Sequence, residues 1–184
     1  MLPHGRGKEK TVMLGLVFLF FLLLAYVENT SFFVYVQSSF TDAPLLAVGL
    51  LFVHNVLAIS LIILAMSFYV EMVYAFMPKR KIEYVILDNP RIFALVFTAV
   101  ILLISILRAS TLVRGQIDVS TLAIVVLLSL PNGLVEGYGI YQAIKKTLKK
   151  ALSTKGLVVI YLIFLVAAAI EVGFVQVLLW ISSQ

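Results

Sequence analysis

Five long apolar runs, separated by short polar stretches, make up most of this sequence. Each run is long enough, or nearly so, to cross a hydrocarbon core about 30 Å thick, because an α-helix rises about 1.5 Å per residue. No polar stretch between the runs is long enough to form a separate domain. The pattern therefore predicts an all-α bundle of five transmembrane helices in one integral membrane domain, residues 1–184. The expected helices lie at about residues 12–36, 44–75, 91–107, 119–144 and 156–181.

The composition agrees with a multi-pass protein of the cell membrane. Hydrophobic residues make up 62% of the 184 positions, whereas a soluble domain averages about 45–50%. A chain of this size cannot bury that surplus in a water-soluble core, so the lipid bilayer must cover most of its surface. The chain has no cysteine, which excludes disulfides, thiolate metal sites and cysteine nucleophiles.

The basic residues set the predicted topology. Of the 14 Lys and Arg residues, twelve fall on one side of the predicted spans, and Arg108 and Arg114 fall on the other. The twelve are Arg6, Lys8, Lys10, Lys79, Arg80, Lys81, Arg91, Lys145, Lys146, Lys149, Lys150 and Lys155. The positive-inside rule then places the N-terminus in the cytoplasm and the C-terminus outside. Because these residues flank membrane spans, we expect them to meet lipid head groups rather than nucleic acid.

Polar residues inside the predicted spans are informative, since they are costly in lipid and need a partner or water. His54 and Asn55 are adjacent on the second predicted helix, and Glu171 lies within the last one, among alanines and a glycine. One interpretation is that these side chains form hydrogen bonds to neighbouring helices and fix their packing. The other is that they line a functional path through the bundle.

The fourth predicted helix contains the sequence Leu-Pro-Asn-Gly near its middle. Pro131 removes a backbone donor and Gly133 adds freedom, so we expect the helix to be broken here; a simple proline kink is the alternative. Asn132 and Glu136 are four residues apart and share a helix face. Gly133 and Gly137 form a G-x-x-x-G pattern on the neighbouring face, which favours close helix packing. We expect Asn132 and Glu136 to face a small polar interior together with the polar residues of the other helices.

Catalytic and nucleotide-binding motifs are missing from the sequence. It contains no H-E-x-x-H, no G-x-S-x-G and no P-loop, which leaves a zinc protease, a serine hydrolase and a nucleotide-binding enzyme without support. A metal site made by His54, Glu136 and Glu171 has no local spacing in its favour. We therefore expect a protein that is not an enzyme and that holds no metal and no cofactor.

Three short motifs resemble the stage II sporulation protein M family of integral membrane proteins. They are the polar pair His54-Asn55, the Leu-Pro-x-Gly-x-x-Glu at residues 130–136 and the late Ala-Ala-Ile-Glu at residues 168–171. One position departs from the family, which typically has a histidine where this chain has Asn132. The resemblance implies a multi-pass scaffold in a membrane-bound, cell-wall-remodelling complex that has hydrolytic partners and no catalysis of its own.

We therefore expect a membrane scaffold or assembly subunit that acts through homo-oligomers or through partner proteins of the membrane or cell envelope. The small residues at positions 133, 137 and 167–173 support this expectation, because they allow helices to approach closely. The alternative is a transporter or channel-like subunit, in which Glu136 and Glu171 form a polar path near the break.

Overall fold

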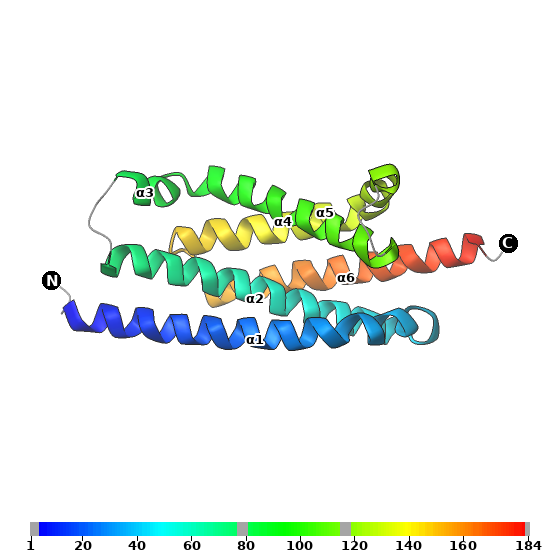
Figure 1. Ribbon diagram of the computed structural model, residues 1–184, viewed down its shortest axis with the longest axis horizontal. Coiled ribbons are helices and arrows are strands. Elements are labelled where there is room, and N and C mark those ends of the chain that lie inside the picture. The colour runs from blue at the N-terminus through cyan, green and yellow to red at the C-terminus, as the bar shows by residue number, and fades with distance from the viewer. Residues whose placement is uncertain (1–3, 77–80, 115–118, 183–184) are drawn as a thin grey trace.

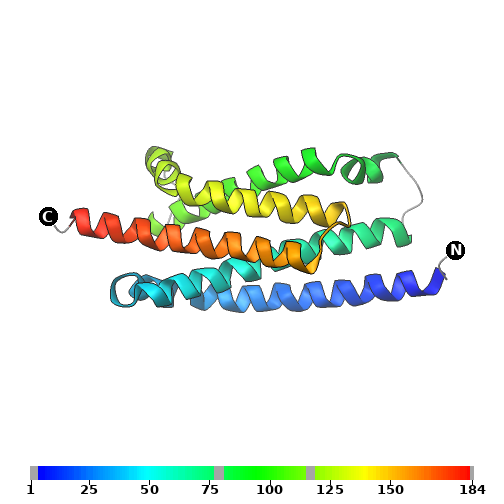
Figure 2. The same ribbon diagram turned by 180° about the vertical axis from the view of Figure 1, so that it is seen from behind.

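The chain forms a bundle of long α-helices (Figures 1 and 2). A computed structural model describes residues 4–76, 81–114 and 119–182. Within these ranges there are six helices and no strand, which confirms the all-α prediction. The helices are α1 (His4–Asp42), α2 (Pro44–Phe76), α3 (Lys81–Asp88), α4 (Pro90–Arg114), α5 (Val119–Leu148) and α6 (Thr154–Ser182).

Among the residues that the structure describes, three helical segments have the length and apolar composition of a membrane span. They are Glu9–Glu28, Pro44–Phe76 and Thr154–Val177. A shorter apolar helix covers Pro90–Ile106. Large apolar side chains point outward from the bundle; Leu23 and Leu45, for example, are 62% and 89% exposed. Such a surface is stable in contact with lipid rather than water.

The helices pack around α2, α5 and α6. Helix α1 lies along α2, α2 contacts both α5 and α6, and α4 packs on α5. In Figure 1, α1 and α4 therefore lie at opposite edges of the bundle. The main core contains Ile59, Val70, Ala94, Ile140, Ala143, Ile144, Leu148, Ile160 and Phe164. A second buried cluster, made of Phe32, Ala47, Leu51, Ala168 and Val172, joins α1, α2 and α6.

Some helix boundaries differ from the predicted ones. Helix α1 reaches Asp42, and one residue separates it from Pro44 at the start of α2, where proline is favoured because its missing N–H has no helical partner. The predicted polar loop at residues 78–91 contains α3, whose Ile86 and Leu87 pack against the main core. The polar composition of residues 78–91 predicted a loop, because the stability of so short a helix comes from tertiary packing rather than from its local sequence.

Helix α5 is kinked at Pro131, whereas the sequence predicted a break in the helix there. It runs continuously from Val119 to Leu148 with Pro131 inside it, and its first turns point in a different direction from the rest (Figure 1). Proline removes one hydrogen bond and crowds the preceding turn, which bends a helix without having to end it.

The glycine prediction was right for one residue of the G-x-x-x-G pair. A Cβ built on Gly137 would lie 2.9 Å from the Leu102 side chain of α4, whereas one on Gly133 would meet nothing within 4 Å. Another glycine of α5, Gly139, lies against α6, and a Cβ there would lie 2.9 Å from the ring of Phe164. The contact with α6 therefore depends on a glycine outside the predicted pattern.

Candidate functional site

Two hydrogen bonds link α5 to its neighbours through the predicted polar residues. The Nδ2 of Asn55 on α2 donates to Oε1 of Glu136 at 3.0 Å. The Nδ2 of Asn132 donates to Oε2 of Glu171 on α6 at 3.0 Å. Asn132 also lies close to Glu136, one helical turn further along α5. The kinked helix thus carries an amide and a carboxyl group, each of which is bonded to a different helix.

The fifth predicted residue, His54, faces α1 instead. Its Nδ1 lies 3.0 Å from both carboxylate oxygens of Glu28, and its ring stacks on Phe32 with the ring centroids 4.3 Å apart. Consecutive helical residues are separated by about 100° around the axis, so His54 and Asn55 contact different helices. The structure brings the other four predicted residues together and pairs His54 with a residue outside that set.

Glu28 was not among the predicted site residues, because it follows the first apolar run rather than lying within it. A signal for its position does exist in the sequence. In an antiparallel hairpin that turns at Ala43, residues at equal distances from the turn lie opposite each other. Phe32 and His54 are each eleven positions from Ala43, and Glu28 precedes Phe32 by one helical turn.

A second polar cluster marks the opposite end of the bundle. Lys10 on α1 and Lys150, just after α5, each donate to Oε1 of Glu71 at 3.2 Å. Counted along the helices, Glu28 lies about 27 Å beyond Lys10 and Asn55 about 24 Å beyond Glu71. The two polar levels are therefore separated by nearly the thickness of a hydrocarbon core, about 30 Å.

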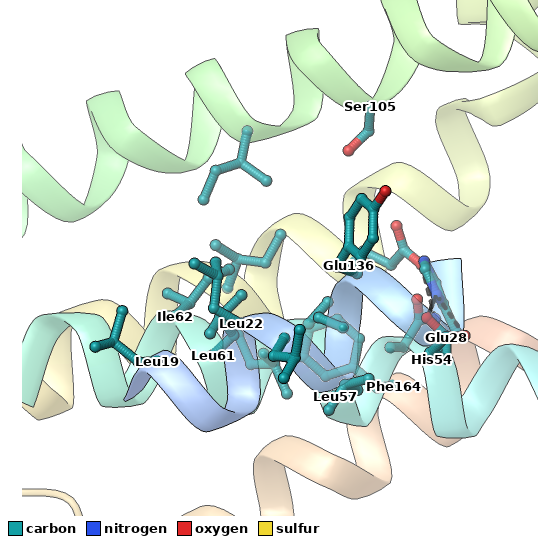
Figure 3. Close-up of a pocket in the computed structure, with 18 residues that line it drawn as sticks. Leu19, Leu22, Glu28, His54, Leu57, Leu61, Ile62, Ser105, Glu136 and Phe164 are labelled. Atoms are coloured by element: carbon teal, nitrogen blue, oxygen red, sulfur yellow. Dashed lines mark hydrogen bonds and ion pairs between the residues drawn. The ribbon is translucent and has the colours of Figure 1, made fainter. Parts of the chain in front are cut away.

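An open groove of about 740 Å³ lies beside the deep polar residues. Figure 3 shows Glu28, His54, Glu136 and Ser105 toward one end of it, and leucine and isoleucine side chains along the rest. The lining residues come from α1, α2, α4, α5 and α6. A smaller pocket of about 250 Å³ lies between α4 and α5, and Asn132, Gly133 and Glu136 are among its lining residues. Glu136 is thus exposed to both cavities, and we call the larger one the α1–α4 groove.

The chemistry available in the groove is hydrogen bonding and proton binding. In the part of the chain that the structure describes, no group of three or more His, Asp or Glu side chains is arranged to hold a metal ion. Within the same ranges, the Oδ1 of Asn132 is buried and accepts no hydrogen bond. Carboxyl and imidazole groups can bind and release protons, and these groups and the amides can hydrogen-bond a polar ligand.

No protein-family model, curated protein or solved structure matches this chain.

Proposed function

We propose that this protein is a scaffold or assembly subunit of the cell membrane that acts through homo-oligomers or through partner proteins of the membrane or cell envelope. In this proposal α1, α2, α4, α5 and α6 span the bilayer, with the N-terminus in the cytoplasm and the C-terminus outside. The resemblance to stage II sporulation protein M points in the same direction. The distribution of the 14 basic residues supports the orientation.

The observation that carries the scaffold role is the pairing of the deep polar groups across helices. Asn55 with Glu136 and Asn132 with Glu171 hold α2, α5 and α6 together. A carboxyl group that faces hydrocarbon costs on the order of 2.5–3.5 kcal/mol, whereas an interhelical hydrogen bond contributes about 0.6 kcal/mol. Avoidance of lipid, more than bond strength, thus fixes the rotation of these helices and the surface that they offer to partners.

Open small-residue positions supply a surface for assembly. Gly49 and Gly173 have nothing within 4 Å of a built Cβ, and both are exposed. Few of the described residues lie outside the helices, so in this proposal partners are contacted mainly through the lipid-facing sides. Mass measurement in mild detergent is expected to give a homo-oligomer. A monomer in that measurement, together with a lack of crosslinks in native membranes, would contradict the assembly proposal.

A transporter or channel-like subunit is the second candidate, because Glu136 lines both cavities beside α5. The substitution Glu136→Gln separates the two functions. Glutamine keeps an acceptor for Asn55 but cannot bind or release a proton at physiological pH.

For a scaffold, we expect Glu136→Gln to keep both assembly and thermal stability close to wild type. Neither the wild-type protein nor the variant should carry a proton flux in liposomes. The matched control is Glu9→Gln, an exposed glutamate on α1 outside both cavities. Proton flux by the wild-type protein that Glu136→Gln abolishes and Glu9→Gln preserves would instead establish the transport function.

A further inference from the structure

The α1–α4 groove has the shape of a binding site for one apolar chain. Leu19, Leu22 and Leu23 of α1 form one wall, with exposed fractions of 57%, 46% and 62%. Ile101 of α4 lies on the other side. The floor is made by α2 and α5, which contact each other. Because the groove is open and its α1 wall is exposed, a chain dissolved in the bilayer can enter it from the side.

The size of the groove favours a small amphiphile over a partner helix. Ligand sites typically enclose about 300–1,000 Å³, and this groove has about 740 Å³. A ten-residue stretch of helix fills roughly 1,200–1,700 Å³, taking a diameter of 10–12 Å with side chains. One hydrocarbon chain with a small head therefore fits the space better than a helix does.

The charge at the polar end selects the head group. Glu28 and Glu136 both line the groove, and His54 is the one imidazole beside them. When both carboxyl groups are ionised, they carry one more charge than a single imidazolium can balance. Asn55 donates to one oxygen of Glu136 and Asn132 lies beside the same carboxyl group, while an ionised carboxylate has about four acceptor positions, so some remain for a ligand. A protonated amine, with three donors and one positive charge, complements this set of acceptors.

On α1, the polar end of the groove lies where the apolar span ends, whereas the apolar span of α2 continues past His54 to Pro44. The apolar span of α1 ends at Glu28, about 27 Å along the helix from the Lys10 level. The leucines of the groove wall precede Glu28, so they lie deeper in the hydrocarbon. An amphiphile in the leaflet opposite Lys10 can enter the groove with its head near Glu28 and its chain beside these leucines.

We propose that the α1–α4 groove binds a single-chain amphiphile with a protonated primary amine. The ammonium group lies between Glu28 and Glu136, and the chain follows α1 and α2 toward Leu19. This site is independent of the scaffold proposal, since a scaffold needs no ligand in the groove.

The test is native mass spectrometry of the full chain in a non-ionic detergent, with dodecylamine, dodecanol and dodecyl sulfate as probes of equal chain length. We expect the amine to bind about tenfold or more tightly than the alcohol, because a charge-assisted hydrogen bond contributes enough free energy for that difference in affinity. The sulfate should bind most weakly. Glu136→Gln should remove most of the preference for the amine. Glu9→Gln, an exposed position that does not line the groove, should leave that preference unchanged.

A second variant keeps the test decisive if Glu136→Gln fails to fold. Leu22→Trp adds bulk on the exposed wall of α1, six residues before Glu28, and it should reduce the binding of the amine and the alcohol alike. Equal binding of all three probes to the wild-type protein would overturn the proposal. So would an amine preference that survives the double variant Glu28→Gln/Glu136→Gln.

Discussion

At the residue scale, close contact between α5 and α6 depends on the missing side chain of Gly139. A Cβ at this position would lie 2.9 Å and 3.1 Å from two ring atoms of Phe164, a ring that is 3% exposed. We expect Gly139→Ala to lower the free energy of unfolding by about 1–3 kcal/mol, as overpacking does. Unfolding of the purified protein by heat or denaturant in detergent measures the change.

Gly133→Ala is the matched control on the same helix. A Cβ there meets nothing within 4 Å, so the substitution should be neutral or should stabilise the helix by about 0.5–1 kcal/mol, since alanine is the better helix former. Equal losses of stability at both positions would contradict the packing described for Gly139.

The bond between Asn132 and Glu171 makes a second prediction at this scale. Replacing Asn132 by leucine leaves the partly buried Glu171 carboxyl without its donor, and we expect a loss of about 1–3 kcal/mol. The same replacement in a Glu171→Leu background should cost less, because no carboxyl is then left unpaired. A double-mutant cycle measured by reversible unfolding gives the coupling free energy, and a value of zero would exclude this bond as a stabilising contact.

At the element scale, the bend of α5 follows from Pro131. Ser120 and Tyr138 are eighteen residues apart, so in a straight helix they share one face and are separated by about 27 Å. Spin labels on cysteines at these positions should give a shorter distance in the wild-type background, and Pro131→Ala should lengthen it toward the straight-helix value. The absence of natural cysteines makes the labelling specific.

Leu134→Ala provides the control for the bend, since it alters an exposed side chain near the proline without changing the backbone chemistry. Pulsed electron paramagnetic resonance should give the same distance for this variant as for the wild type. An unchanged distance in Pro131→Ala would show that tertiary contacts, rather than the missing N–H, bend the helix.

At the scale of the whole molecule, the orientation in the membrane can be tested with single cysteines. Ser153→Cys lies in the exposed turn before α6, and a second variant carries a cysteine appended after Gln184. With intact cells and a membrane-impermeant maleimide, we expect the appended cysteine to react. The cysteine of Ser153→Cys should react only after the membrane has been permeabilised. This expectation follows from the excess of basic residues on one side.

The cysteine-free parent is the control for background labelling. If both cysteines react from the same side, α6 does not span the bilayer, and the proposed five-span topology is wrong.

The sequence by itself determined the properties that depend on local composition. Long apolar runs require the backbone to satisfy its own hydrogen bonds in lipid, so the helices and their approximate extents could be predicted. Polar residues stand out against those runs, which made Asn55, Asn132, Glu136 and Glu171 recognisable. An interrupted pattern at Pro131 was also visible, although its local chemistry did not distinguish a break from a kink.

The tertiary structure alone decided how those residues are used. The rotation and contacts of each helix depend on distant packing, and a single sequence does not specify them. For this reason His54 pairs with Glu28, outside the predicted set, and Gly139 rather than Gly133 contacts α6. The α1–α4 groove arises in the same way, because it exists where α1 and α4, far apart in sequence, are held at opposite edges of α2 and α5.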